Sequence, residues 1–200
     1  MSLTVNVNKQ SSIAPIPQGT YLAVCYMLVD LGMQYSEAFK KSSRKVLIGW
    51  EVPEETITID GEERPRNITK QYTASLNESA SLRQDLAAWR GRDFTPEELE
   101  AFDLRNIVGT SCMINVVHKV KKDGKTFANI QSIMALPKGM PKGELDQKPV
   151  IFDLDTAEVE QVDGLPGWIA DMIKKSSTYQ EKLVQAPEIT ETEDDGDIPF

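Results

Sequence analysis

Histidine and cysteine are scarce in this sequence. His118 is the only histidine, and Cys25 and Cys112 are the only cysteines. A structural zinc site needs four such ligands at close spacing, so this class of site is excluded. Both cysteines lie in apolar segments. We therefore expect buried free thiols in a reducing compartment, in preference to a disulfide, and no metal or other cofactor.

The chain also lacks a long apolar run, a charged and then apolar leader, and a glycine-rich loop that could cradle phosphates. These absences predict a cytoplasmic protein with no secretion signal and no membrane contact. His118 shares its strand face with apolar residues, which favours a core or edge histidine over a catalytic one. We therefore do not expect an enzyme.

Charge is distributed unevenly along the chain, which has 200 residues and a net charge of −9. Residues 1–142 carry 18 basic and 16 acidic residues, residues 143–187 carry 4 and 9, and residues 188–200 carry 6 acidic residues alone. A slightly basic body is thus followed by an acidic end. Such polarity is more informative about partners than the overall charge.

Alternating apolar residues and turn signals predict five strands with a helical segment between the third and the fourth. Asp60-Gly61 and residues 121–125 are the expected hairpin turns, and residues 31–43 the expected loop between the first two strands. Gly91 should end one helix, and Thr95-Pro96 should begin a second. The expected strands are 19–30, 44–60 (interrupted near Pro53), 66–76, 113–120 and 126–136.

This order of elements is that of an OB fold, and it predicts a mainly β protein with a five-stranded OB-fold barrel. A short strand at 149–155 and one amphipathic helix at 165–183 should follow a Pro/Gly-rich linker. The expected organisation is an N-terminal arm (1–18), the OB-fold domain (19–142), a C-terminal extension with a helix (143–187) and a disordered acidic tail (188–200).

Basic residues gather at the two loops through which OB folds bind oligonucleotides. Lysines follow phosphates, and exposed aromatic rings stack on bases of any kind, so this pattern predicts binding of single-stranded DNA. The alternative is that these are ordinary solvated loop tips. The candidate DNA-binding residues are Tyr35, Phe39, Lys40, Lys41, Arg44, Lys45, Lys70, Tyr72, Lys119, Lys121, Lys122, Lys125 and Phe127.

The aromatic residues divide into candidate base contacts and candidate core residues. Phe127 shares a strand face with Asn129 and Gln131, which favours solvent exposure, whereas Tyr72 has both polar and apolar neighbours on its face and is ambiguous. The residues expected in the core are Trp50, Trp89, Trp168, Tyr21 and Tyr26.

The last residues form an acidic run that ends in Ile198-Pro199-Phe200. The ring of Phe200 can enter an apolar pocket on a partner protein while its terminal carboxylate meets a basic residue at the rim of that pocket. The acidic residues before Phe200 can steer the tail toward this rim. The candidate partner-binding residues are Asp194, Asp195, Asp197, Ile198, Pro199 and Phe200.

This tail resembles the C-terminal tip of bacterial single-stranded DNA-binding proteins, in which Ile-Pro-Phe recruits replication and repair proteins. Most of the body is similar to OB-fold single-stranded DNA-binding proteins of bacteriophages. That resemblance implies a host bacterial cytoplasm as the location. The body motifs that carry it are Gly19-Thr20-Tyr21, 48–53, Trp89-Arg90-Gly91-Arg92, Phe94-Thr95, 115–118, Ala128-Asn129-Ile130, 152–155 and 165–169.

The sequence thus predicts a protein that coats and protects single-stranded DNA in replication, recombination and repair, and recruits other proteins through its tail. The alternative is an adaptor with little DNA affinity that occupies tail-binding pockets of host proteins. A third hypothesis, a metal-dependent nuclease using Glu97, Glu98 and Glu100, is disfavoured because acids are stabilised at a helix start in any case. The oligomeric state stays open, including a homo-oligomer.

Overall fold

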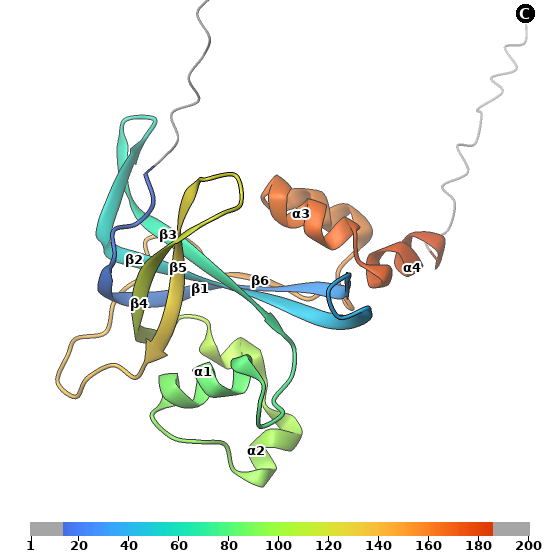
Figure 1. Cartoon of the computed structure of the whole chain (residues 1–200), viewed down its shortest axis with the longest axis horizontal. Coiled ribbons are helices and arrows are strands. Elements are labelled where there is room, and N and C mark those ends of the chain that lie inside the picture. Colours follow the sequence, from blue (N-terminus) through green and yellow to red (C-terminus); the bar gives the residue numbers. More distant parts are fainter. Residues whose placement is uncertain (1–13, 186–200) are drawn as a thin grey trace, which may run out of the picture.

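The computed structural model describes residues 14–185, which form a strongly curled β-sheet with helices on both of its sides (Figure 1). The helices are α1 (Ser81–Arg90), α2 (Pro96–Ala101), α3 (Gly167–Lys174) and α4 (Ser177–Gln185), with 3-10 turns η1 (Leu104–Ile107) and η2 (Val159–Gly164). The strands are β1 (Gly19–Ser36), β2 (Lys41–Ile59), β3 (Glu62–Thr73), β4 (Ser111–Val120), β5 (Thr126–Met134) and β6 (Val150–Phe152).

The five long strands are antiparallel and lie in the order β3-β2-β1-β4-β5. β1 pairs with β2 along most of its length and with β4 over Gly19–Val24. Beyond that point β6 takes the place of β4 and pairs with β1 in parallel. The sheet curls into a half-barrel, and among residues 14–185 no ladder joins its two outer strands, β3 and β5. A mainly β fold is confirmed.

The first hydrophobic core fills the inside of the half-barrel. Trp50 of β2 is fully buried there, and its ring centroid lies 5.7 Å from that of Trp89 on α1. α1 faces this core with Leu82, Leu86 and Trp89, which its helical spacing places on one side. The helical segment between β3 and β4 therefore closes one end of the half-barrel.

A second core lies on the opposite face of β1 and β2. Met27 and Leu31 of β1 and Leu47 of β2 pack there against Ile169 and Ile173 of α3. Because side chains alternate across a strand, β1 can serve both cores only by being apolar on both faces, as its sequence is. The C-terminal helices are thus part of the packed body.

Gly32 fixes how closely the C-terminal helices approach β1. Its φ is +70°, and a Cβ atom at this position would lie 2.7 Å from Oγ of Ser176 and 2.8 Å from Leu154. Ser176 in turn donates from Oγ to the carbonyl of Ile173 and accepts from the backbone N–H of Tyr179. The break between α3 and α4 therefore fits against a β1 position that only glycine can occupy without strain.

The residues just before β1 also pack on the body. Ile16 is buried in the first core, and its carbonyl oxygen lies 2.8 Å from Nε2 of His118 on β4. The hydroxyl of Tyr21 donates to the carbonyl of Pro17. His118 is therefore a satisfied edge residue, as the sequence predicts.

Several local predictions are confirmed by backbone geometry. Asp60 and Gly61 both have positive φ (53° and 84°), as a two-residue hairpin turn requires. Gly91 ends α1 in the left-handed region, and Thr95 begins α2 with a full capping box. The β2–β3 pairing shifts register between Val52 and Thr56, next to Pro53.

Three predictions are wrong. Most of 31–43, expected as a loop, belongs to β1 and β2, because these strands run on as a long hairpin whose turn is only 37–40. The single helix expected at 165–183 is two helices, α3 and α4, separated at Lys175 and Ser176. Trp168 was expected in the core but is 50% exposed, because the buried face of α3 is formed by Ile169, Ala170 and Ile173.

Glu98 stabilises the start of α2 in an acid-sensitive way. Its carboxylate accepts from Arg92 and from the backbone N–H of Thr95, and it also binds Arg90. The hydrogen bond from Arg92 is the main cause that lowers the pKa of Glu98 to about 2, with the Thr95 N–H next. The contribution of this carboxylate is therefore fully present above its unfolded pKa near 4.5 and disappears as the pH falls toward 2.

We expect Glu98→Gln to lower the thermal midpoint at pH 7 by a few degrees, because the cap and the charge-assisted bonds to Arg90 and Arg92 weaken. The difference in thermal midpoint between this variant and the wild type, measured by circular dichroism, should shrink as the pH falls from 4.5 to 2. Glu100→Gln on the same helix, whose carboxylate makes no hydrogen bond among residues 14–185, is the control. An equal decrease of the thermal midpoint in both variants, or a decrease in Glu98→Gln that does not depend on pH, would contradict the stabilisation of α2 by ionised Glu98.

No helix among residues 14–185 is long and apolar enough to cross a membrane.

Candidate nucleic-acid interface

The β4–β5 hairpin combines an aromatic ring with lysines on the outer face of the sheet. Phe127 lies directly opposite Lys119 in the ladder and is half-buried. Nζ of Lys121 lies 5.4 Å from the centroid of the Phe127 ring. Ala128 and Ile130 point to the first core, so Phe127 and Asn129 face outward. If a base stacked on Phe127, the ammonium groups of Lys119 and Lys121 would lie near the phosphates on either side of that nucleotide.

The turn of this hairpin places further lysines at its tip. The backbone N–H of Lys121 donates to the carbonyl of Lys125, and Gly124 adopts the positive φ (81°) that the turn requires. Lys121, Lys122 and Lys125 are all exposed. The structure therefore brings together every candidate residue that the sequence placed on this loop.

A hollow of about 470 Å³ lies at the seam between β3 and the β4–β5 hairpin. Lys119 and His118 line it from β4, and Asn129 and Gln131 from β5. Lys70 reaches it from β3. The two amide side chains were not among the candidate residues of the sequence, although their alternation with Ala128 and Ile130 already indicates an outward orientation.

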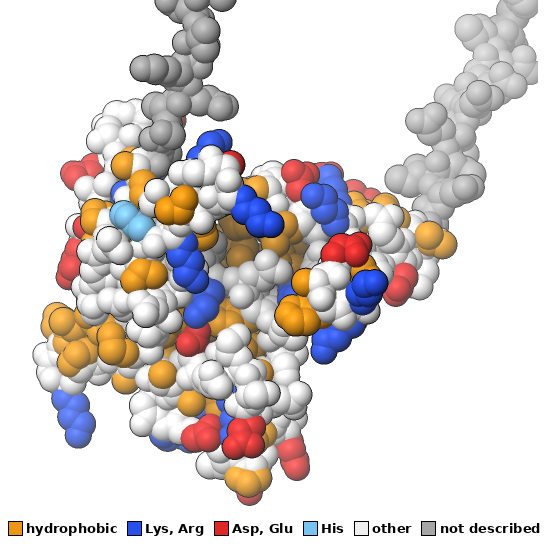
Figure 2. Space-filling view, in the orientation of Figure 1, with side chains coloured by type: hydrophobic (Ala, Val, Ile, Leu, Met, Phe, Trp, Pro, Cys, Tyr) orange, Lys and Arg blue, Asp and Glu red, His pale blue; other side chains and the backbone are white. Residues whose placement is uncertain are grey.

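The surface is hollowed between the β4–β5 hairpin and α3, and we call this depression the groove (Figure 2). Apolar side chains lie on its floor, and Lys or Arg side chains lie along both of its sides, with Asp or Glu side chains among them on the α3 side (Figure 2). The C-terminal helices, which cover the outer face of β1 and β2 through Leu47 and Met27, thus also form one wall of the groove.

The other candidate DNA-binding residues lie at the end of the β1–β2 hairpin, residues 35–45, which we call the β1–β2 tip. Phe39 is 77% exposed and Tyr35 is 57% exposed, so both rings can contact a ligand. Lys40 and Lys41 are exposed beside them. Lys45 lies further along β2, where Nζ donates to Oγ1 of Thr73 at 2.6 Å.

Arg44 was predicted to contact DNA, but the structure shows it in ion pairs within the protein. Its guanidinium binds the carboxylates of Asp30, which is largely buried, and of Asp155, at 2.6 Å. These hydrogen bonds, above all those to Asp30, raise the pKa of Arg44. An arginine already neutralised by two carboxylates is not a free phosphate contact, so Arg44 ties the segment after β6 to the β1–β2 hairpin.

Lys70 and Tyr72 were also candidate DNA-binding residues, and both bind Asp85 within the protein. Nζ of Lys70 lies 2.6 Å from Oδ2 of Asp85 on α1, and the Tyr72 hydroxyl donates to the same oxygen at 2.8 Å. Tyr72 is only 3% exposed, and burial is the main cause that raises its pKa. Its ring therefore belongs to the first core and cannot stack on a base, and the charge of Lys70 is offset by Asp85.

The nuclease hypothesis is not supported by the positions of its acids. Glu98 is occupied by Arg90, Arg92 and the cap of α2. The one group of acids among residues 14–185 close enough to share an ion is Asp30, Asp153 and Asp155, and Arg44 binds two of these three. Asp30, Asp153 and Asp155 line a pocket of about 290 Å³, but Arg44 lines the same pocket and neutralises two of the three carboxylates.

The two thiols are buried structural groups. Burial is the main cause that raises the pKa of Cys25 to about 12, and it also raises that of Cys112. Both are free thiols in the wall of the first core, as the sequence predicts. Neither can act as a nucleophile at neutral pH.

The candidate interface consists of the β4–β5 hairpin, the groove beside it and the exposed β1–β2 tip. The predicted partner-binding residues, Asp194 to Phe200, lie outside the described residues. No protein-family model matches this chain, and no curated protein matches its sequence.

Proposed function

We propose that this protein binds single-stranded DNA without sequence preference, and that it coats and protects the strand in replication, recombination and repair. One observation carries the proposal. The outward-facing Phe127 lies opposite Lys119 in the ladder and 5.4 Å (ring centroid) from Nζ of Lys121, beside a groove with Lys or Arg side chains on both sides. Aromatic rings for bases and cations for phosphates are what non-specific binding of a single strand requires.

We further propose that the half-barrel is an OB fold. The order β3-β2-β1-β4-β5 and the helices between β3 and β4 agree with that topology. In an OB fold, oligonucleotides lie across the second and third strands between the loops after the first and the fourth. The β1–β2 tip and the β4–β5 hairpin occupy these two loop positions here.

In the mechanism that we propose, one base stacks on Phe127 while Lys119 and Lys121 neutralise the flanking phosphates. Asn129 and Gln131 offer hydrogen bonds to base edges without a fixed pattern, because both amides are donors and acceptors. Every base has a π-face, so stacking does not select the sequence. No bond of the DNA is broken in this scheme, and the protein is a binder and not an enzyme.

The second half of the proposal concerns the acidic tail. Asp194, Asp195, Asp197 and Ile198-Pro199-Phe200 carry the chemistry that would enter a basic-rimmed apolar pocket on a replication or repair protein. We propose that the tail recruits such partners while the body holds the DNA. The proposed setting is the bacterial cytoplasm.

The first experiment is fluorescence anisotropy with a labelled single strand of about 30 nucleotides and a duplex of equal length, a size chosen to exceed the site of one OB fold. We expect tight binding to the single strand alone, weakening as salt rises, because neutralised phosphates release counterions. Absence of binding at low salt would refute the proposal and would leave an adaptor role for the tail.

Phe127→Ala should weaken binding to a single strand about tenfold, because a stacked base contributes about 1–3 kcal/mol. Phe127→Tyr should retain most of the affinity, since it keeps the ring. Met134→Ala, at an apolar position of the same strand that is 42% exposed, is the control for a change in β5 itself. Equal affinities of the Phe127→Ala and wild-type proteins would exclude Phe127 as the stacking platform.

A further inference from the structure

The two ends of β2 carry opposite charges and complementary shapes. Residues 37–45, at its start, contain one glutamate and four basic residues, of which Arg44 is paired with Asp30 and Asp155, and Phe39 projects from the turn. Residues 53–66, around its end, contain five acidic residues and two arginines. The β1–β2 tip and the β2–β3 hairpin lie at opposite ends of the sheet (Figure 1).

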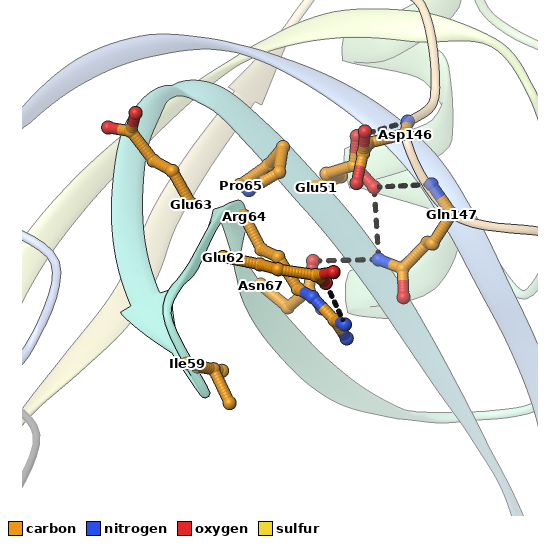
Figure 3. A pocket seen from close by; sticks show the side chains of 9 residues that line it. All are labelled: Glu51, Ile59, Glu62, Glu63, Arg64, Pro65, Asn67, Asp146 and Gln147. Atoms are coloured by element: carbon orange, nitrogen blue, oxygen red, sulfur yellow. Dashed lines mark hydrogen bonds and ion pairs between the residues drawn. The ribbon is translucent and has the colours of Figure 1, made fainter.

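The acidic end is hollowed. A cavity of about 700 Å³ lies at the base of the β2–β3 hairpin, with Glu62, Glu63 and Asp146 on its walls (Figure 3). Ile59, which is 42% exposed, and Pro65 supply apolar surface there. Arg64 is the only basic residue among the lining residues, and Glu62 already pairs with it at 2.6 Å.

One wall of this cavity is held rigidly. Glu51 is 1% exposed, and its carboxylate accepts hydrogen bonds from the backbone N–H of Asp146 at 2.8 Å and from Nε2 of Gln147 at 3.0 Å. Gln147 also donates to Oδ1 of Asn67 on β3 at 2.9 Å (Figure 3). The segment after β5 is thereby fastened across β2 and β3, and the cavity is a preformed feature of the body.

We propose that this acidic cavity binds the β1–β2 tip of a second copy of the chain, with Phe39 against Ile59 and Pro65 and with Lys40 and Lys41 facing Glu62 and Glu63. The chemistry matches in both respects: an exposed ring meets apolar surface, and ammonium groups meet carboxylates. Because the two surfaces differ and lie at opposite ends, each copy can contact one neighbour at each end. Such a heterologous contact does not form an isologous dimer, and it extends into an open row unless the rotation between copies closes a ring.

This contact goes beyond the proposed function, because it joins protein to protein and needs no DNA. Phe39, Lys40 and Lys41 also belong to the candidate DNA interface, whereas Glu62 and Glu63 would serve the contact between copies alone. If the proposed function holds, a row of copies would bind a long strand cooperatively, each bound copy adding a docking site for the next.

Sedimentation velocity of the full chain without DNA tests the contact between about 1 and 100 µM, the range of weak association. We expect the weight-average sedimentation coefficient to rise with concentration at low salt and to stay at the monomer value at about 0.5 M salt. The variant Lys40→Glu/Lys41→Glu and the variant Glu62→Lys/Glu63→Lys should each remain monomeric, because all four side chains are exposed and like charges then face each other.

Mixing the two variants is the decisive step. One variant then has two basic ends and the other two acidic ends, so the mixture should regain at least half of the wild-type rise in sedimentation coefficient. A wild type that stays monomeric at low salt, variants that associate like wild type, or a mixture that stays monomeric would each overturn the proposal.

DNA binding distinguishes this inference from the proposed function. On a strand of about ten nucleotides, which suits one copy, Glu62→Lys/Glu63→Lys, which lies outside the candidate DNA interface, should not lower affinity, whereas on a long strand the steepness of the binding isotherm should fall. An isotherm on the long strand that is as steep as that of the wild type would overturn the proposed contact. Association without any DNA binding would leave the contact standing and refute the proposed function alone.

Discussion

Affinity for single-stranded DNA should fall about 100-fold at moderate salt when Lys121, Lys122 and Lys125 are all replaced by alanine. Each phosphate contact on a single strand contributes about 0.7 to the slope of log affinity against log salt, so three lost contacts lower that slope by about 2. All three lysines are exposed at the turn of the β4–β5 hairpin, and the turn itself is held by backbone bonds that alanine retains.

A matched control exists in the same chain. Lys138, Lys142 and Lys148 are also exposed and lie on the segment between β5 and β6. Their replacement by alanine changes the net charge by the same amount, so general electrostatic attraction falls equally in both variants. Titrations at several salt concentrations separate local contact from net charge. Equal losses in the two variants would show that the hairpin is not the phosphate-binding element.

The second large effect is expected on stability. Ile173→Ala should lower the free energy of unfolding by about 2–5 kcal/mol, because a fully buried side chain of the second core is replaced by a cavity. Urea denaturation should show one transition at a lower midpoint, recorded identically by circular dichroism and tryptophan fluorescence. A single transition is expected since β1 and β2 form part of both cores.

Val184→Ala on α4 is the control for this substitution, because Val184 is 87% exposed and the change removes a similar number of atoms. Its midpoint should stay close to that of wild type. Two separate transitions in Ile173→Ala, with the later one at the wild-type position, would mean that the C-terminal helices unfold independently of the half-barrel.

Local rules predicted the parts of the fold that depend on neighbouring residues. The Asp60-Gly61 turn, the end of α1 at Gly91 and the start of α2 at Thr95 each follow from the φ angles or hydrogen bonds that these residue types favour. The strand at 150–152 was also expected. Its parallel pairing with β1 was not, because nothing near it in sequence indicates its partner.

The candidate site was predicted where exposure follows from alternation along a strand or from a position in a hairpin turn. Phe127 and the hairpin lysines are examples. Arg44 was misjudged because Asp155, one of its two partners, lies 111 residues away in the sequence. Trp168 was misjudged because the apolar stripe of α3 is wider than its buried face, which consists of Ile169, Ala170 and Ile173.

The second core has a consequence for how the chain is made. β1 and β2 leave the ribosome well before the segment that covers them, because Met27, Leu31 and Leu47 pack against side chains from residues 145–179. During that interval the apolar outer face of β1 and β2 is exposed on the nascent chain and can associate with other chains. Residues 145–179 therefore cover the outer face of β1 and β2 only late in synthesis, and fragments that stop after β5 should aggregate even though they contain the five long strands of the half-barrel.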